Sequence, residues 1–269
     1  MKKKIVALLL IIGAFIQIFP FLWLITFSFK SNSEIFGDNV LGLPQKWLWA
    51  NYQRVFSSSN IIRFLANSFL ITAIAIIGAG ILASMAAFAI TRLKWKFSNA
   101  VYILFLLGMM IPLHAVLLPL FITLRPVLNT YLALIIPYIG FAMPLSILIL
   151  CGSFKGIPRE LEEAAYVDGA SVYRVFLAVL LPLTKPVLAT VSILTYLSSW
   201  NELMFAITFI NKEEFKTLTF GIMSMTGRYV TNWGPIGAGL VVATIPTLII
   251  YILMSEQIQA SLAAGAVKG

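Results

Sequence analysis

Long runs of apolar residues alternate with shorter polar intervals along the whole chain. The runs cover residues 5–29, 64–91, 97–124, 131–154, 186–211 and 236–254. Each run is long enough to cross a bilayer, because an α-helix needs about 20 predominantly apolar residues to do so. We therefore predict an all-α integral membrane protein with six transmembrane helices.

The composition supports this class. Hydrophobic residues make up 60% of the 269 residues and charged residues 11%, whereas soluble domains carry about 25% charged residues. The net charge of +9 does not predict nucleic-acid binding, because Lys and Arg in a membrane protein chiefly set its orientation and contact lipid head groups. The first run is too long for a secretory signal, and no small-residue cleavage site follows it.

Basic residues distinguish between the two orientations that six spans allow. With a cytoplasmic N-terminus, the inner intervals hold 11 of the 19 Lys and Arg residues and the outer intervals hold 8. The lysines at residues 2–4 and the basic turn at residues 92–96 lie close to span ends, where they weigh most. We therefore expect both termini, and the polar interval at residues 157–186, to face the cytoplasm.

That polar interval collects charges in a chain that otherwise has few. They are Arg159, Glu160, Glu162, Glu163, Asp168, Arg174 and Lys185. Pro158 suits the first position of a helix, and the three glutamates that follow complement the helix dipole. Helical spacing also predicts one shared face that contains two small alanines: Leu161, Ala164, Ala165 and Asp168. Such a face would allow a partner to approach closely.

The same interval contains the signals for a second helix. Gly169 is a suitable C-terminal stop for the first helix, and Ser171 can cap the next one. Pro182 is expected to end that second helix, and Pro186 to begin the following span. A water-facing re-entrant segment without a partner is the alternative, and nothing in the interval indicates catalysis.

Several short motifs resemble those of a known family. Three of them, Glu163-Ala164-Ala165, Asp168-Gly169-Ala170 and Leu181-Pro182-Leu183, resemble the EAA loop of binding-protein-dependent ATP-binding cassette (ABC) importers. Asn67-Ser68 opens the second span much as in that family. Trp200-Asn201 and the terminal residues 265–269 resemble its carbohydrate branch. The chain is thus similar, over essentially its whole length, to the smaller six-span permease subunit of maltose-type importers.

The resemblance implies a type I ABC importer permease fold in a bacterial or archaeal cytoplasmic membrane. The EAA loop would be a coupling element that docks into a cleft of an ATP-binding subunit. The residues implied for this contact are Glu160, Glu163, Ala164, Ala165, Asp168 and Gly169. The implied partners are a second homologous permease, two ATP-binding cassette subunits, an extracytoplasmic solute-binding protein, membrane lipid and a sugar.

The chain contains no GxxxxGKS or GxxxxGKT phosphate loop. We therefore expect ATP and Mg²⁺ to bind to the partner subunits, and this chain to be a transport subunit that binds no cofactor and has no ATPase site. Its single cysteine, Cys151, excludes an internal disulfide, and no cluster of Cys and His is present to hold a metal.

Three parts of the chain are expected. They are a first span with an extracytoplasmic segment at residues 1–63, a permease core at 64–258 with its coupling loop at 155–185, and a cytoplasmic tail at 259–269. The resemblance also implies that the outer segment at residues 212–235 contacts the solute-binding protein. The residues that suit this contact are Tyr229, Asn232 and Trp233.

Glu202 is the acidic residue that falls inside a predicted span. Placing a charge there costs roughly 2.5–3.5 kcal/mol on insertion scales, so such residues usually face a cavity or a partner. With Ser198, Ser199 and Asn201 it forms a polar patch whose hydroxyl, amide and carboxylate groups suit sugar recognition. We predict that this patch lines the translocation path, and an interhelical polar clamp without ligand contact is the alternative.

Other functions were weighed against carbohydrate import. An intramembrane enzyme needs a nucleophile, an acid pair or a metal site, yet His114, Cys151 and Glu202 fall on different predicted spans. A stand-alone secondary transporter often has paired broken-helix repeats and several buried ionisable groups, and would leave the polar interval without a purpose. An ABC permease for a non-sugar solute, such as an amino acid or phosphate, is the nearest alternative.

Overall fold

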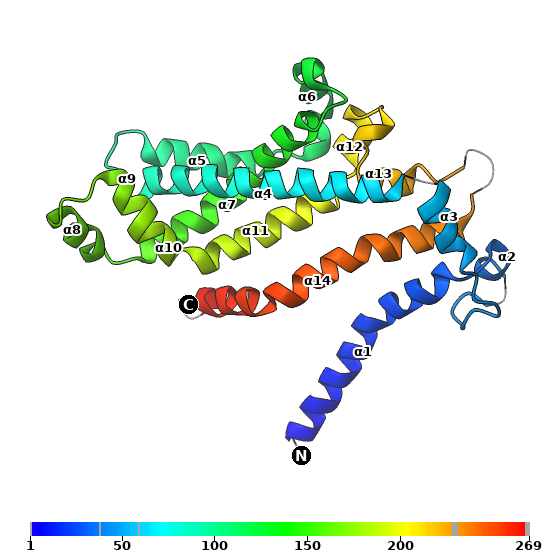
Figure 1. The fold of residues 1–269 in the computed structure, drawn as a ribbon. Helices are drawn as coiled ribbons and strands as arrows, with labels where there is room; N and C mark the ends of the chain where they lie inside the picture. Colours follow the sequence, from blue (N-terminus) through cyan, green and yellow to red (C-terminus); the bar gives the residue numbers. More distant parts are fainter. Residues whose placement is uncertain (1, 38, 59, 228–230, 267–269) are drawn as a thin grey trace. The chain divides into compact units, whose positions relative to one another are not determined.

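The computed structural model describes residues 2–37, 39–58, 60–227 and 231–266, and every regular element in these ranges is helical (Figure 1). The chain forms two compact units. Unit 1 comprises Met1–Leu65 and Thr217–Leu248, and unit 2 comprises Ala66–Lys216 and Ile249–Gly269. The predicted all-α class is confirmed.

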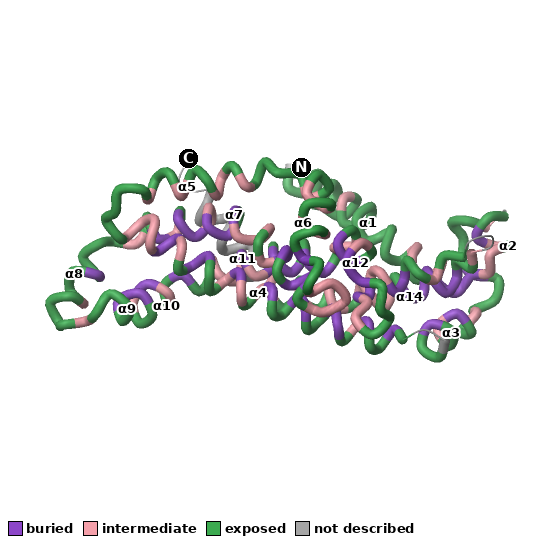
Figure 2. The backbone as a smooth tube through the Cα atoms, turned by 90° about the horizontal axis from the view of Figure 1, so that it is seen from above, coloured by how far each residue is buried: buried purple, intermediate pink, exposed green. Residues whose placement is uncertain are grey.

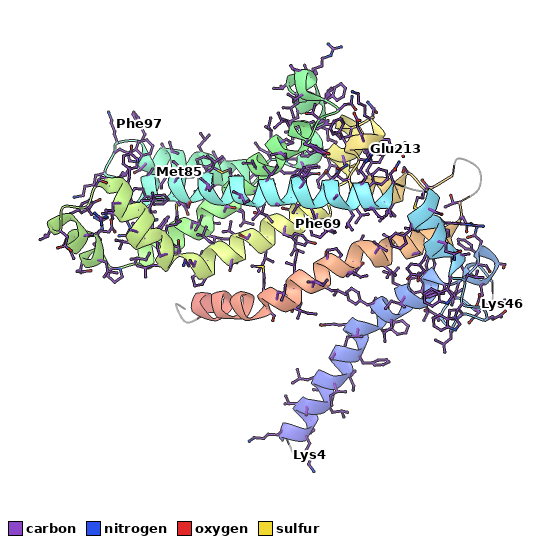
Figure 3. The ribbon with its side chains drawn as sticks, viewed as in Figure 1. Lys4, Lys46, Phe69, Met85, Phe97 and Glu213 are labelled. Carbon is purple, nitrogen blue, oxygen red and sulfur yellow. The ribbon has the colours of Figure 1, made fainter. Side chains whose placement is uncertain are left out.

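Unit 1 contains the first predicted span and the segments around it. Its helices are α1 (Lys2–Ser28), α2 (Asn32–Ile35), α3 (Ala50–Ser58), α13 (Leu218–Met223), the start of α4 (Ile61–Thr91) and the first part of α14 (Trp233–Ala266). Lys4 lies near one end of this unit and Lys46 near the other (Figure 3). α1 therefore separates the N-terminal lysines from the segment that follows the helix.

A buried lysine organises the segment that follows α1. The side chain of Lys30 is fully buried, and its Nζ atom donates to the carbonyl oxygens of Asn39 at 2.6 Å and Val40 at 3.1 Å. The Phe29 ring packs edge-on against the rings of Trp47 and Trp49, with centroids 5.0 and 4.8 Å away. The polar interval after the first span is therefore a folded cap rather than an extended linker.

The last helix is longer than its apolar run predicted. The side-chain oxygen of Asn32 accepts a hydrogen bond from the Trp233 backbone N–H at 2.8 Å, so a distant residue caps the start of α14. The helix therefore begins at Trp233 rather than at residue 236. It also continues past residue 254 to Ala266, through most of the predicted tail at 259–269, because that segment is rich in Ala and other good helix formers.

Unit 2 holds the remaining elements. They are most of α4, α5 (Ser98–Gly108), η1 (Leu113–Val116), α6 (Leu117–Thr123), η2 (Arg125–Val127), α7 (Leu132–Gly156), α8 (Glu160–Val167), α9 (Val172–Arg174), the π-helix η3 (Val175–Leu180), α10 (Leu181–Leu183), α11 (Lys185–Trp200), α12 (Met204–Phe209) and η4 (Glu213–Phe215). α7 packs against both α5 and α11. The short elements α8 to α10 lie at one end of the unit, and α6 and α12 lie toward the other (Figure 1).

Small residues let α4 pack closely against other helices of this unit. Four alanines spaced four apart are fully buried: Ala75, Ala79, Ala83 and Ala87. At Gly78 an added Cβ atom would lie only 2.5 Å from the side chain of Ile139 in α7. The two helices therefore approach more closely than a larger residue would allow.

The core of unit 2 extends to the end that carries α8 to α10. It includes the rings of Phe88 in α4, Phe154 in α7 and Phe176 in η3. The Phe88 and Phe176 ring centroids are 5.0 Å apart. Figure 2 shows buried residues along the packed helices of this unit, whereas the trace around α8 is mostly exposed. The short helices after α7 are thus attached to the core on one side and open on the other.

Two of the predicted spans are bent or broken. By length and composition alone, α1, α4, α7 and α14 could each cross a membrane, and two bent helix pairs raise the number to six among the described residues. The third predicted run bends by 97° between Ser98–Gly108 and Leu113–Thr123. Pro112 lies at this bend, and proline commonly kinks or breaks a helix.

The apolar run at residues 186–211 forms two helices rather than one. α11 begins at Lys185 and stops at Trp200, and α12 begins only at Met204. The break forms because the side chain of Glu202 accepts hydrogen bonds from the first backbone N–H groups of α12. A side-chain cap of this kind stabilises a new helix start.

Candidate functional site

The connection from α7 to α8 is tight. α7 ends at Gly156, and Ile157 adopts an extended conformation with ψ 129°, as expected for a residue before proline. Pro158 was predicted as the first helical residue, but α8 begins at Glu160 with Arg159 as its N-cap. The proline therefore sets the direction of the turn and lies outside the helix.

The end of α8 follows the prediction. Gly169 has a positive φ of 77°, a backbone conformation that glycine adopts without a steric penalty. The Gly169 N–H donates to the Tyr166 carbonyl at 3.0 Å, and the Ala170 N–H donates to the Ala165 carbonyl at 2.9 Å. These two bonds form a Schellman motif, which satisfies carbonyl groups that a helix end leaves unpaired. Gly169 is thus confirmed as the stop.

The second helix of the element starts as predicted but ends differently. The Ser171 hydroxyl accepts from the Arg174 backbone N–H at 3.4 Å, so the predicted cap is present. Pro182 was expected to end the helix, yet helical structure continues through Leu183. Proline is tolerated there because it occupies the first turn of α10, where a missing N–H costs little. The chain then bends by 76° into α11.

Residues predicted to contact an ATP-binding subunit form an open surface on α8 and its C-terminal turn. Those that are exposed are Glu160, Glu163, Ala164, Asp168 and Gly169. Ala165 is half-buried and packs against the core of unit 2. Two apolar side chains close to this surface, Val167 and Tyr173, are 88% and 79% exposed. A mixed polar and apolar surface on a helix of small residues is suited to docking with a protein.

The opposite side of α8 carries a buried ion pair that the sequence pattern did not reveal. Glu162 is 7% exposed, and its Oε1 atom lies 2.7 Å from Nη1 of Arg92. We had grouped Glu162 with Glu160 and Glu163 as charges near the helix start. The available signal was its spacing of three residues from Ala165, which also faces inward.

Ser198, one of the four residues of the predicted translocation patch, lines a cavity between α7 and α11. The cavity has a volume of about 160 Å³, and its polar side chains are Ser146, Thr195 and Ser198. The Ser198 hydroxyl donates to the Thr195 carbonyl at 3.0 Å. Phe141 adds an aromatic ring to the wall. Hydroxyl groups beside an aromatic ring are compatible with sugar binding.

The other three patch residues point in different directions. Ser199 is buried, whereas Asn201 is exposed and donates to the Leu197 carbonyl of its own helix at 2.9 Å. Glu202 accepts from the Phe205 N–H at 2.9 Å and from the Tyr138 hydroxyl at 2.9 Å. Its carboxylate therefore joins α7, the end of α11 and the start of α12. The structure brings Ser198 and Glu202 to the α7 side, but not all four residues to one surface.

Side-chain amides hold the loop at residues 211–216 near the α12 end of unit 2. The Oδ1 atom of Asn129 accepts from the backbone N–H groups of Asn211 at 2.5 Å and Lys212 at 3.0 Å. The Nδ2 atom of Asn67 donates to the carbonyls of Glu214 and Lys216. This loop begins the outer segment predicted to contact a solute-binding protein. Of the residues proposed for that contact, Asn232 and Trp233 are exposed, and Tyr229 lies outside the described residues.

Comparison with known proteins relates the chain to transport systems. Residues 76–264 match the family described as binding-protein-dependent transport system inner membrane component. The trehalose/maltose transport system permease protein MalG of Thermococcus litoralis is 34% identical, over 97% of this chain and 97% of that protein. The diacetylchitobiose uptake system permease protein NgcG of Streptomyces coelicolor is 31% identical, over 97% of this chain and 87% of that protein.

A solved structure has the same fold. It is the crystal structure of a bacterial ABC transporter involved in the import of the acidic polysaccharide alginate. One of its chains superposes with a TM-score of 0.81 at 24% sequence identity, covering 94% of this chain and 95% of that one. This similarity concerns the fold alone, and it confirms the predicted type I ABC importer permease fold.

Proposed function

This chain belongs to the family of binding-protein-dependent transport system inner membrane components, and we propose that it is one permease subunit of an ABC importer for a sugar or oligosaccharide. The observation that carries the proposal is the element formed by α8 to α10. A glycine turn ends the short helix α8, and five of the six residues predicted for docking are exposed on this helix and turn. Family membership favours a transport subunit over an intramembrane enzyme and over a transporter that works alone.

The substrate class is supported by the two named relatives, which belong to systems for trehalose or maltose and for diacetylchitobiose. Both align with nearly the whole of this chain. The cavity at Ser198 has three hydroxyl-bearing side chains in an otherwise apolar wall, and these could contact a sugar. A non-sugar solute is the alternative that the transport experiment below distinguishes.

Transport needs partners that supply energy and substrate. The sequence lacks a phosphate loop, so ATP and Mg²⁺ bind to two separate cassette subunits and this chain binds no cofactor. A second, homologous permease completes the central path. An extracytoplasmic binding protein delivers the sugar to the outer face. Closure of the cassette subunits around ATP moves α8, and the two permeases then switch between inward-facing and outward-facing states.

The orientation inferred from the distribution of Lys and Arg residues puts α8 to α10 in the cytoplasm of a bacterial or archaeal cell, together with both termini. The basic turn at residues 92–96 supports this assignment, because Arg92 contacts Glu162 and the turn therefore lies at the α8 end of unit 2. Phe97 and Glu213 lie toward opposite ends of that unit (Figure 3). The loop at residues 211–216 would then face outward, where the binding protein docks.

Reconstituted transport tests the function. The two permeases and two cassette subunits would be placed in proteoliposomes, with ATP inside and binding protein outside. We expect uptake of a labelled di- or oligosaccharide that requires both ATP and binding protein. Uptake of an amino acid or phosphate, with no sugar transported, would contradict the substrate class. Uptake of any solute by this chain alone would contradict the importer assignment.

A further inference from the structure

One arginine joins the ends of three helices at the α8 end of unit 2. Arg92 directly follows α4, and its side chain is only 4% exposed. The guanidinium forms the 2.7 Å ion pair with Glu162 in the first turn of α8. Its Nη2 atom donates to the backbone carbonyls of Phe154 and Ile157, the latter at 2.7 Å. These two carbonyls lie at the end of α7.

The groups in this cluster compensate one another in part: among the described residues, Nε of Arg92 has no hydrogen-bond partner, and Oε1 of Glu162 meets the guanidinium as an ion pair without hydrogen-bond geometry. A buried ion is tolerated only when an opposite charge and hydrogen bonds replace the water it has lost. Glu162 supplies the charge, and the carbonyls of Phe154 and Ile157 supply acceptors at the negative end of the α7 dipole. A guanidinium can serve both at once because its donors are arranged in a rigid planar fork. A lysine has one point charge and lacks that fork.

The cluster gives α8 a direct connection to a helix that is remote in sequence. Along the chain, α8 is attached to α7 through residues 157–159 and to α11 through the helices after Gly169. Arg92, which directly follows α4, lies 70 residues before Glu162, by the difference between positions 92 and 162. In the described part of the chain, Glu162 is the α8 side chain that forms an ion pair with a residue outside its own helix. Ala165 adds only apolar contact.

We propose that Arg92 and Glu162 are positioning residues that transmit displacement of α8 to α4 and α7 together. This inference rests on the proposed function, because it requires a cassette subunit that moves α8. The exposed face of α8 makes the external contact, and the buried ion pair on its other side makes the internal one. Without the pair, α8 still docks, but its movement reaches the spans only along the chain and through apolar contacts.

The test measures coupling in the complete assembly of both permeases, the cassette subunits and the binding protein. Glu162→Gln keeps the shape of the side chain and removes its charge, and Arg92→Lys keeps the charge and removes the fork. We expect both variants to assemble and to keep slow basal ATP hydrolysis. Stimulation by sugar-loaded binding protein should fall about tenfold or more, which is within the usual range of coupling between sites.

A matched control lies two residues after Arg92. Lys94→Gln removes an exposed cation from the same turn and should leave stimulation and sugar uptake at the wild-type level. A merely structural role for the pair would reduce assembly, basal hydrolysis and stimulated hydrolysis in proportion. The proposed role lowers the stimulated rate selectively and raises the ATP consumed per sugar transported.

A double variant separates coupling from folding. Arg92→Met combined with Glu162→Leu replaces both charges by apolar side chains, an exchange that is often neutral for stability when both members of a buried pair change. We expect this variant to assemble and to stay uncoupled. Normal stimulation in it would overturn the proposal, and so would failure of every variant to assemble. If wild type itself lacks stimulation by binding protein, the proposed function fails instead.

Discussion

The hydroxyl of Tyr138 in α7 donates a 2.9 Å hydrogen bond to the carboxylate of Glu202, which lies between α11 and α12. The same carboxylate caps α12 through the backbone N–H groups of Phe205 and Ala206. A carboxylate within an apolar run is costly unless such donors surround it. This arrangement explains why the fifth apolar run contains an acidic residue and why it breaks into two helices.

The stability of the folded protein should therefore depend on both Tyr138 and Glu202, and more strongly on Glu202. Tyr138→Phe removes one donor and should cost about 1–3 kcal/mol, since an acceptor loses its partner. Glu202→Ala also removes the cap of α12, worth about 0.5–2 kcal/mol by itself, and should cost more. Thermal unfolding of the purified assembly, followed by labelling of the buried thiol of Cys151, measures both effects. Tyr173→Phe, at a side chain that is 79% exposed, is the control, and equal unfolding temperatures for all variants would contradict the arrangement.

The positive φ of Gly169 predicts a graded series of substitutions. An added Cβ atom meets no atom within 4 Å at this position, so Gly169→Ala carries only the backbone penalty, roughly 1–2 kcal/mol. Gly169→Asn should cost less, because asparagine tolerates this conformation. Hydrogen exchange of amides in the last turn of α8 should be slowest in the wild type, faster in Gly169→Asn and fastest in Gly169→Ala.

A matched glycine provides the control for that series. Gly152 lies inside α7, and an added Cβ atom there also meets nothing within 4 Å. Gly152→Ala should be neutral or slightly stabilising, because alanine is favoured over glycine within a helix. If Gly152→Ala and Gly169→Ala had the same effect on stability, the backbone argument for Gly169 would be wrong.

Asn129 is the non-glycine residue of the described chain with a positive φ, 58°. Asn129→Gly keeps the backbone conformation and removes the acceptor for the Asn211 and Lys212 amides. Asn129→Ala removes the acceptor and also disfavours the backbone conformation. Each variant should raise hydrogen exchange at those two amides by a few-fold to about tenfold, as expected for bonds worth about 1 kcal/mol. Both variants should lower the melting temperature, and the alanine variant should lower it more, because it also loses the residue that tolerates the positive φ. Unchanged exchange in both variants would show that the loop does not depend on this side chain.

The cavity beside Ser198 offers a test of the translocation path. Ser198→Trp would fill the space of about 160 Å³ between α7 and α11 and should abolish sugar uptake while the assembly remains intact. Ser198→Ala should have little effect, because the hydroxyl donates to a carbonyl of its own helix. Leu197→Trp places the same indole ring at an exposed neighbouring position and serves as the control. Uptake at the wild-type rate in Ser198→Trp would exclude this cavity from the path.

Local features of the coupling element could be predicted from sequence, and distant contacts could not. The glycine stop at Gly169 and the serine cap at Ser171 depend on residues a few positions away, so the pattern identified both. The pairing of Arg92 with Glu162 joins two segments far apart in the chain, and no periodicity identifies such partners. The sequence did not predict the break before α12, because the pattern around Glu202 indicated a path-lining patch or an interhelical clamp and gave no signal for a helix cap.

ATP hydrolysis by the purified assembly, with wild type compared with Gly169→Pro, tests the central claim most directly. Proline cannot adopt the φ of 77° found at Gly169, so the C-terminal turn of α8 must change while the spans stay intact. We predict that sugar-loaded binding protein stimulates the wild type, and that the variant assembles but loses this stimulation. A variant that responds as wild type does would contradict the assignment of α8 to α10 as the coupling element.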